Sequence, residues 1–377
     1  MVTNTTGINN TAVGKSSLGA LTEGIDNTAL GSNAGDALTD ADYNVAVGMQ
    51  ALSGDTLGSR STAIGRRSLY TQNFETATDT YNTAVGFNSG YSVTTGTDNT
   101  LIGGMSGDAI TDGNTNTAVG SYSLTTNQRG DRNTAIGHEA LKVLNPSGDV
   151  DTYNTAVGYQ SGVAVTTALY NTHVGAKAGL GSTTGNYNTF FGYTTGESNI
   201  DGGQNVIIGA VSNTAATGGD YANGLGYSLN CVAGYTTLGK VNDDIRAAHG
   251  NVTWATVSDE RVKKDIEDAT VGLAFINDLR PVTFNYKNKG DLPENFRGYE
   301  EGSTEVYKNS KSQHGFIAQE VKAAIDKHSD IKDGFSMWDD DDLTGQQRVG
   351  ETAIVPMLTK AIQELSAKID TLQTENT

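Results

Sequence analysis

Residues 10–209 repeat one short pattern of polar, small and apolar positions. The pattern is Asn-Thr-Ala-Val-Gly with variation: its fourth place is always a large apolar residue and its fifth is always Gly. Successive copies are 17 residues apart, and a step of 21 residues enters twice. A fixed interval over so many copies predicts a β-solenoid in which each copy belongs to one turn. The copies begin at Asn10, Asn27, Asn44, Ser61, Asn82, Asn99, Asn116, Asn133, Asn154, Asn171, Asn188 and Asn205.

The places within one copy predict how a turn folds. The large residue in the fourth place suits a strand side chain that faces a buried seam. The Gly in the fifth place suits a sharp turn or the close approach of another backbone. A small residue follows three places later, and we therefore expect two short strands in each turn, joined at the Gly. The remaining residues predict a loop, which contains both insertions, at about 69–81 and 141–153.

Two further expectations concern how the turns hold together. Stacked turns would place the leading Asn residues in a ladder whose side-chain amides bond to neighbouring turns. The third place is mostly Ala, so one chain has few bulky residues for a core of its own. We therefore expect burial by association with other copies of the chain.

Composition changes near Ser258 and divides the chain. Residues 1–257 carry 30 charged residues, whereas the 120 residues from Ser258 onward carry 38, and 39 of the 47 glycines precede Ser258. We assign residues 1–209 to a repeat shaft, 210–257 to frayed repeats and a neck, and 258–377 to a separate domain.

Charge and residue types exclude several classes of partner. A net charge of −18 argues against nucleic acid or an anionic membrane surface. No apolar stretch is long enough to span a membrane. The single Cys231 cannot form an intrachain disulfide, and the five histidines lack metal-ligand spacing, so we predict no metal and no cofactor. Residues 339–342 are all Asp and are interpreted as a solvated loop, with calcium binding as the less favoured alternative.

Four sequence blocks mark the C-terminal 120 residues. They begin with Ser258-Asp-Glu-Arg-Val-Lys, Leu279-Arg-Pro-Val-Thr-Phe, His314-Gly-Phe-Ile-Ala-Gln and Ile354-Val-Pro-Met-Leu. In order and spacing they resemble the intramolecular chaperone domain of phage endosialidases and tail fibres, a self-cleaving serine–lysine peptidase family. The repeats in turn resemble trimeric adhesin heads and, more closely, Asn-Thr-Ala-Leu-Gly arrays of phage tail fibres. Both resemblances imply a homotrimer.

The resemblance also implies a processing site. Ser258 and Lys263 occupy the nucleophile and general-base positions of the family, and the implied reaction is cleavage of the Val257–Ser258 bond. A lysine can act as a base once its surroundings disfavour its charge. The alternative is that Ser258 only caps a helix that begins at Asp259. No activity on an external substrate is predicted.

The end of the chain predicts an amphipathic helix. Leu358, Ile362, Leu365, Ile369 and Leu372 follow one another at the spacing of a coiled-coil seam. The alternative is an ordinary helix packed on its own domain. The expected fold is thus mainly β: a homotrimeric β-roll or β-solenoid fibre of 17-residue repeats, then an α+β chaperone domain ending in a helical, coiled-coil-like segment.

Aromatic residues just before the pentads are candidate receptor contacts. Stacked turns would line one edge of the shaft with rings that could grip sugars, although the same rings could simply brace the stack. The candidates are Tyr43, Tyr81, Tyr153, Tyr170 and Tyr187.

The function we expect is that of a phage tail fibre protein of the virion, assembled in the host cytoplasm. Its expected partners are two further copies of itself, a host-surface glycan or other receptor, and other tail proteins. One alternative is a tailspike enzyme that degrades host surface polysaccharide, and another is an ice-binding rod or a cell-surface trimeric adhesin. A 17-residue repeat leaves little room for a deep catalytic groove, which favours binding over catalysis.

Overall fold

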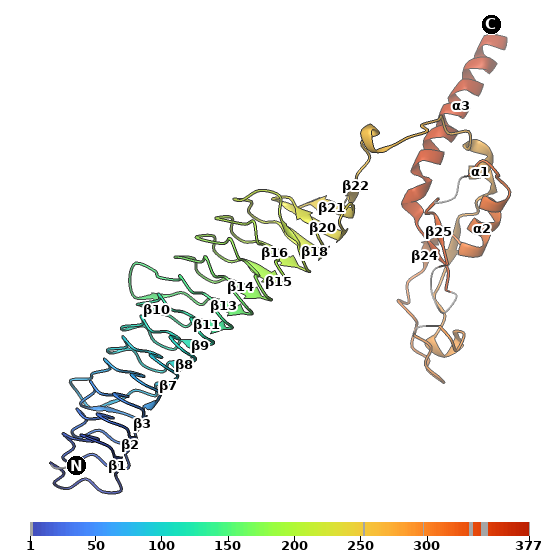
Figure 1. Cartoon of the computed structure of the whole chain (residues 1–377). Helices are drawn as coiled ribbons and strands as arrows, with labels where there is room; N and C mark the ends of the chain where they lie inside the picture. The colour runs from blue at the N-terminus through green and yellow to red at the C-terminus, as the bar shows by residue number, and fades with distance from the viewer. Residues whose placement is uncertain (1–2, 252, 297, 332–334, 341–345, 377) are drawn as a thin grey trace. The chain divides into compact units, whose positions relative to one another are not determined.

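The computed structural model describes residues 3–251, 253–296, 298–331, 335–340 and 346–376 (Figure 1). The chain forms two compact units, residues 1–258 and 259–377, and each is described by itself. Of the residues 339–342, 341 and 342 lie outside the described residues.

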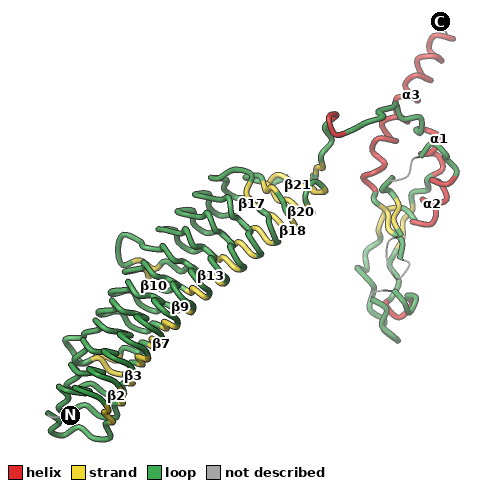
Figure 2. The backbone as a smooth tube through the Cα atoms, in the orientation of Figure 1, coloured by secondary structure: helices red, strands yellow, loops and turns green. Residues whose placement is uncertain are grey.

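The first unit is a β-solenoid built on one long sheet. Each of the twelve pentads contributes a single three-residue strand, which pairs in parallel with the strands of the turns before and after it. Figure 2 shows these strands in yellow along one side of the turns. The strands are β1 (Thr11–Val13), β2 (Thr28–Leu30), β3 (Val45–Val47), β5 (Thr62–Ile64), β7 (Thr83–Val85), β8 (Thr100–Ile102), β9 (Thr117–Val119), β11 (Thr134–Ile136), β13 (Thr155–Val157), β14 (Thr172–Val174), β15 (Thr189–Phe191) and β16 (Val206–Ile208).

The expectation of two strands in each turn is wrong for most turns. After the Gly the backbone runs through turns that reverse it within a few residues, so no second strand forms there in the described pentad turns apart from three two-stranded pairs. In two of these pairs the second strand lies within an insertion. The pairs are β4 (Gly58–Ser59) with β6 (Thr78–Asp79), β10 (Gly130–Asp131) with β12 (Val150–Asp151), and β17 (Asn213–Thr214) with β19 (Asn230–Cys231).

Four further strands close the sheet at its C-terminal end. The first two continue the parallel pairing, and the last two pair antiparallel. They are β18 (Asn223–Tyr227), β20 (Tyr235–Lys240), β21 (Asp243–Ala248) and β22 (Ala255–Thr256).

The interior of the solenoid corrects the expectation for the fourth place. From Ala29 to Ile207, the third-place side chains are at most 1% exposed, whereas Val13 in the fourth place is 56% exposed and Ile136 is 38% exposed. Side chains alternate along a strand, so only one of the two places can face inward. The interior is small, and leucines from the turns after the strand fill it beside the alanines. The fourth-place side chains therefore lie on the outer face of the sheet.

Two features of the pentad behave as expected. The fifth-place Gly of each turn approaches the next turn closely: a Cβ on Gly120 would lie 2.5 Å from the carbonyl oxygen of Gly137, and its φ is +133°. The Asn ladder forms as well. The backbone N–H of Asn44 donates to Oδ1 of Asn27 over 2.9 Å, and Nδ2 of Asn44 donates to the carbonyl of Gly58 over 3.0 Å. Asn44 thus links two turns and closes its own turn, and most other pentad Asn residues bond in the same way.

Larger third-place residues occur where the surrounding turns provide glycine. Leu101 lies against Gly90 and Gly107, at each of which a Cβ would come within 2.8 Å of it. His173 lies in the same way against Gly162 and Gly179, and its ring stacks on Phe190 with centroids 5.3 Å apart. His173 is fully buried, and within the described residues neither ring nitrogen has a hydrogen-bond partner. Burial lowers the pKa of His173 from 6.5 to about 4.

We predict that His173 weakens the solenoid in acid. The unfolded chain binds a proton on this ring below pH 6.5 and the folded chain only below about 4, so stability should fall as the pH drops from 6.5 towards 4. At about 1.4 kcal/mol for each pH unit, the loss from this group is about 3 kcal/mol per chain. The variant His173→Leu places in this turn the residue that Leu101 provides at the same place of its own turn. It should remove the part of the pH dependence of stability that His173 causes.

The comparison of wild type with His173→Leu by denaturant unfolding at pH 7 and pH 4.5 isolates this residue. Other groups, such as Asp108, whose pKa burial raises to about 6, contribute equally to both proteins. Equal pH dependence in the two proteins would contradict the prediction.

The second unit is a small α+β domain with a core of its own around Phe275, Val321 and Met337. Its final helix packs on α1, with Ala361 buried. Its elements are η1 (Glu260–Val262), α1 (Leu273–Asp278), β23 (Val282–Phe284), η2 (Lys289–Asp291), β24 (Gln313–Gly315), α2 (Ala318–Asp326), β25 (Trp338–Asp339), β26 (Arg348–Val349), η3 (Glu351–Ile354) and α3 (Val355–Glu375).

Candidate functional site

Ser258 lies in the segment that leaves the last strand of the solenoid. Val257 alone separates Ser258 from the end of β22, and η1 begins two residues after Ser258. Both Ser258 and Val257 are exposed. An exposed, extended segment is the form in which a backbone carbonyl can be reached by a nucleophile. The Val257–Ser258 bond is therefore sterically open to attack.

The single turn of η1 separates the two predicted catalytic residues. Asp259 is its N-cap, because the Asp259 side chain accepts a hydrogen bond from the backbone N–H of Arg261 over 2.9 Å. Lys263 is its C-cap, and the backbone N–H of Lys263 donates to the carbonyl of Glu260. The alternative that Ser258 caps a helix is wrong in this detail: the capping residue is Asp259.

A salt bridge reinforces this turn. The guanidinium of Arg261 contacts both carboxylate oxygens of Asp259, at 2.9 and 2.6 Å. The hydrogen bonds from Arg261 lower the pKa of Asp259 to about 2. The Asp259 carboxylate is therefore the charged partner of Arg261 at neutral pH.

The environment of Lys263 decides whether it can act as a base. Lys263 is exposed in the single chain. Large apolar side chains in the same segment are exposed as well: Val257 at 58%, Val262 at 70% and Ile266 at 65%. Exposed apolar groups of this size are typical of a segment that another surface can cover, and such a cover would also remove water from Lys263.

The five predicted receptor residues lie in one ladder along the solenoid. Each has a positive φ, between 48° and 60°, and an exposed ring. Tyr170 stacks on Tyr153 and on Tyr187, with ring centroids 5.6 and 4.9 Å apart. The faces of these rings are thus turned towards one another. A ligand would meet mainly their edges and hydroxyl groups.

Sequence reasoning missed the charged members of this ladder. Arg60 lies over the ring of Tyr43, 4.8 Å from its centroid, and its Nε is 2.9 Å from Asp79. Arg132 lies over the ring of Tyr153 in the next turn and pairs with Asp151, as Arg60 does with Tyr81 and Asp79. The two arginines are 72 residues apart, which is three steps of 17 and one of 21. That longer interval was the signal that could have revealed them.

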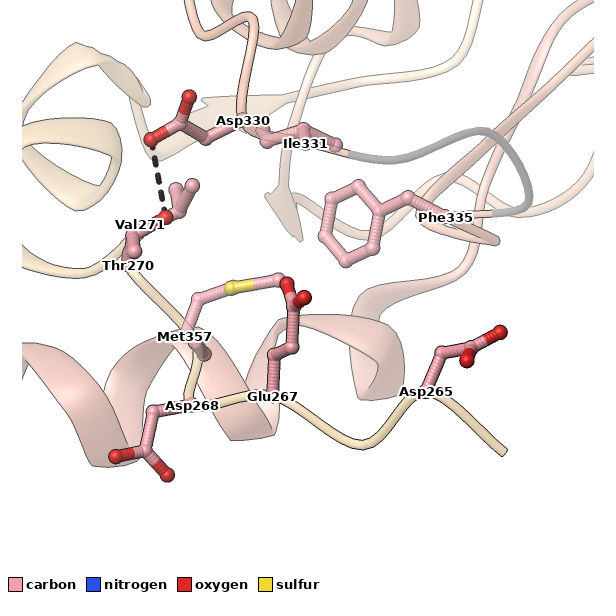
Figure 3. A pocket seen from close by; sticks show the side chains of 10 residues that line it. Asp265, Glu267, Asp268, Thr270, Val271, Asp330, Ile331, Phe335 and Met357 are labelled. Atoms are coloured by element: carbon pink, nitrogen blue, oxygen red, sulfur yellow. Dashed lines mark hydrogen bonds between the residues drawn. The ribbon is translucent and has the colours of Figure 1, made fainter. Parts of the chain in front are cut away.

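A cavity of about 590 Å³ in the second unit is a separate candidate. Figure 3 shows Asp265, Glu267 and Asp268 around it, with Thr270 bonded to Asp330 over 3.0 Å. The carboxylates do not converge on one point. Among the residues that the structure describes, no group of three or more His, Cys, Asp or Glu side chains could hold a metal ion. No described helix has the length and apolar character needed to cross a membrane.

Comparison with known protein families finds a match that begins at Ser258. Residues 258–330 match the protein family described as the chaperone of endosialidase. This family is associated with homotrimer formation, and such a domain next to a solenoid suggests a trimerising protein of the tail-fibre or tailspike type. Comparisons with curated proteins and with solved structures find no match to the chain.

Proposed function

We propose that the chain is a tail-fibre protein whose solenoid forms a homotrimeric shaft and binds a receptor on the host surface. Residues 258–377 template the assembly and then leave by cutting the Val257–Ser258 bond. One observation carries the proposal: the chaperone-family match begins at Ser258, the residue at which the chain divides into its two compact units. A template that is released after use has to be joined to its product at such a boundary.

The proposed cleavage uses only the chain and water. The Ser258 hydroxyl attacks the carbonyl carbon of Val257 and gives its proton to Lys263. The peptide bond breaks, Lys263 returns the proton to the departing amine, and an ester now joins Val257 to the Ser258 oxygen. Water hydrolyses this ester, which leaves a carboxylate on Val257 and restores the Ser258 hydroxyl at a new amino terminus.

The exposure of Lys263 in the single chain supports a link between cleavage and assembly. Neighbouring copies that cover Val257, Val262 and Ile266 would also exclude water from Lys263, which a lysine acting as a base requires. The cut would then follow trimerisation. Removing the template after folding makes assembly hard to reverse.

The exposed seam of α3 supports the homotrimer. Leu358, Ile362 and Leu365 are 39–66% exposed, because α3 packs on its own domain through Ala361. An ordinary amphipathic helix would have turned this seam inward. Three parallel copies of α3 would bury it as a short coiled coil, at the end of the chain where a template can set the register.

The template role predicts a large effect of deletion. Neighbouring turns of the solenoid are nearly alike, so copies that slip by one 17-residue turn keep most contacts, and finding the correct register should be slow. A chain of residues 1–257 alone should therefore be mainly insoluble, whereas the full chain yields soluble trimers. Expression of both, followed by size-exclusion chromatography with light scattering, tests this. Soluble, heat-resistant trimers of residues 1–257 made alone would contradict the template role.

The receptor part of the proposal rests on the aromatic ladder. Its exposed hydroxyls, with the guanidinium and carboxylate groups beside them, offer donors and acceptors in a row, as a polysaccharide does. The matching assay is retention of the mature trimer on surface polysaccharides of candidate hosts. Release of oligosaccharides in the same assay would instead indicate a degrading enzyme.

A further inference from the structure

The outer face of the long sheet carries two parallel rows of side chains. The second places of the pentads, ten Thr and two Val, form one row, and the fourth places form the other. Both rows point away from the interior, because the third-place side chains between them point into it. The face is thus a strip of Thr and aliphatic side chains along the whole array.

This strip is apolar and exposed within one chain. In the fourth place, Leu30 is 49% exposed, Ile102 is 38% and Phe191 is 54%. Neither row contains a charged residue in any of the twelve pentads. Charges occur elsewhere on the turns, for example Asp40, Asp112 and Arg129. A continuous strip without charges, on a chain of net charge −18, has the composition of an interface rather than of a free surface.

The interior offers no space for this strip. The alanines of the third place and the leucines of the turns already fill the solenoid, and the fifth-place glycines bring successive turns into contact. Rotating a strand to bury its fourth place would expose the third place and break the Asn ladder. The strip can be covered only from outside the chain.

We propose that the outer face of the long sheet is the interface between copies of this chain in the homotrimer. The inference rests on the proposed function, which supplies the number of copies, and adds the surface they use. The spacing of the side chains indicates that the partner covering this face is another copy of the chain. The strip presents one large apolar side chain about every 4.8 Å, and a second copy aligned in register presents side chains at the same spacing. Seven of the strip's twelve fourth-place side chains are 38–56% exposed in one chain, so another copy would bury apolar groups along the length of the array.

The arrangement makes a specific geometric prediction. Around a threefold axis that runs along the shaft, equal-numbered residues of the three chains face one another. Ile102 should therefore meet Ile102 of both neighbours. Thr95, which is exposed but outside the two rows, should remain far from its equivalents.

Single cysteines at these two positions test the interface in the full chain. The natural Cys231 is fully buried, and burial raises its pKa to about 11, so it should not compete. In the assembled protein, Ile102→Cys should react with a maleimide label about tenfold or more slowly than Thr95→Cys. Ile102→Cys should also form covalent dimers under mild oxidation, whereas Thr95→Cys should not. Equal melting temperatures would show that both variants fold alike.

The outcomes separate this inference from the proposed function. A trimer in which Ile102→Cys labels as fast as Thr95→Cys and does not cross-link would overturn the interface and leave the trimer intact. A folded monomer by light scattering would overturn both. Cross-linking confined to Ile102→Cys supports the interface.

Discussion

Replacement of Ser258 by Ala should abolish processing, so that the full chain of 39.4 kDa persists where the wild type splits into residues 1–257 and 258–377. The variant lacks the hydroxyl that attacks the Val257 carbonyl, but it removes no packing, since Ser258 is exposed beyond the end of β22. Uncleaved protein should therefore still fold and assemble. Intact-mass spectrometry after incubation reports both fragments.

The chain contains a matched control for the base. Lys263→Ala should block cleavage as completely as the loss of Ser258, whereas Lys264→Ala changes the adjacent exposed lysine and should leave cleavage intact. A new amino terminus at any residue other than Ser258, or normal cleavage in Ser258→Ala, would remove this pair from the mechanism.

Replacement of Gly120 by Ala should destabilise the solenoid by more than any surface change. The new Cβ would lie 2.5 Å from the carbonyl oxygen and 2.6 Å from the carbonyl carbon of Gly137, and the φ of +133° is one that Ala rarely adopts. Neither atom can move easily, because the N–H of Gly137 donates to Val119 over 2.7 Å. We expect a loss of about 4 kcal/mol or more per chain, seen as a much lower melting temperature or as loss of soluble protein.

Gly148→Ala provides the comparison within the same array. A Cβ at this position, in the second insertion, meets no atom within 4 Å. The change should stay within about 0.5 kcal/mol of wild type. If Gly120→Ala melted like Gly148→Ala, the close stacking of successive glycines would be wrong.

The repeat predicted much of the shaft from sequence. A constant interval, an invariant Gly and a leading Asn each have few physical explanations, and the structure confirms the solenoid, the glycine contacts and the Asn ladder. The direction of the strand side chains could not be obtained in the same way. Alternation places Ala118 and Val119 on opposite faces but does not say which face is inside.

Packing decides that question, and packing depends on residues far from the pentad. Leu124 enters the same interior as Ala118, so the small alanine is sufficient and the larger Val119 lies outside. The larger Leu101 fits in the third place of its turn because Gly107 has no side chain and leaves room for it. At the candidate site, the sequence indicated Ser258 and Lys263 through resemblance alone, while the cap at Asp259 depends on local backbone geometry. The arginines of the ladder were hidden because only two turns carry one, at Arg60 and Arg132, and the equivalent place 72 residues later is Gln204.

The mass of the assembled shaft is the most direct test of the account. Native mass spectrometry of the purified wild-type protein should show three copies of residues 1–257, each ending at Val257, with residues 258–377 cut from them. That result would join the Ser258 boundary, the exposed sheet face and the chaperone match in one assembly. A stable, folded monomer of the full chain would contradict it.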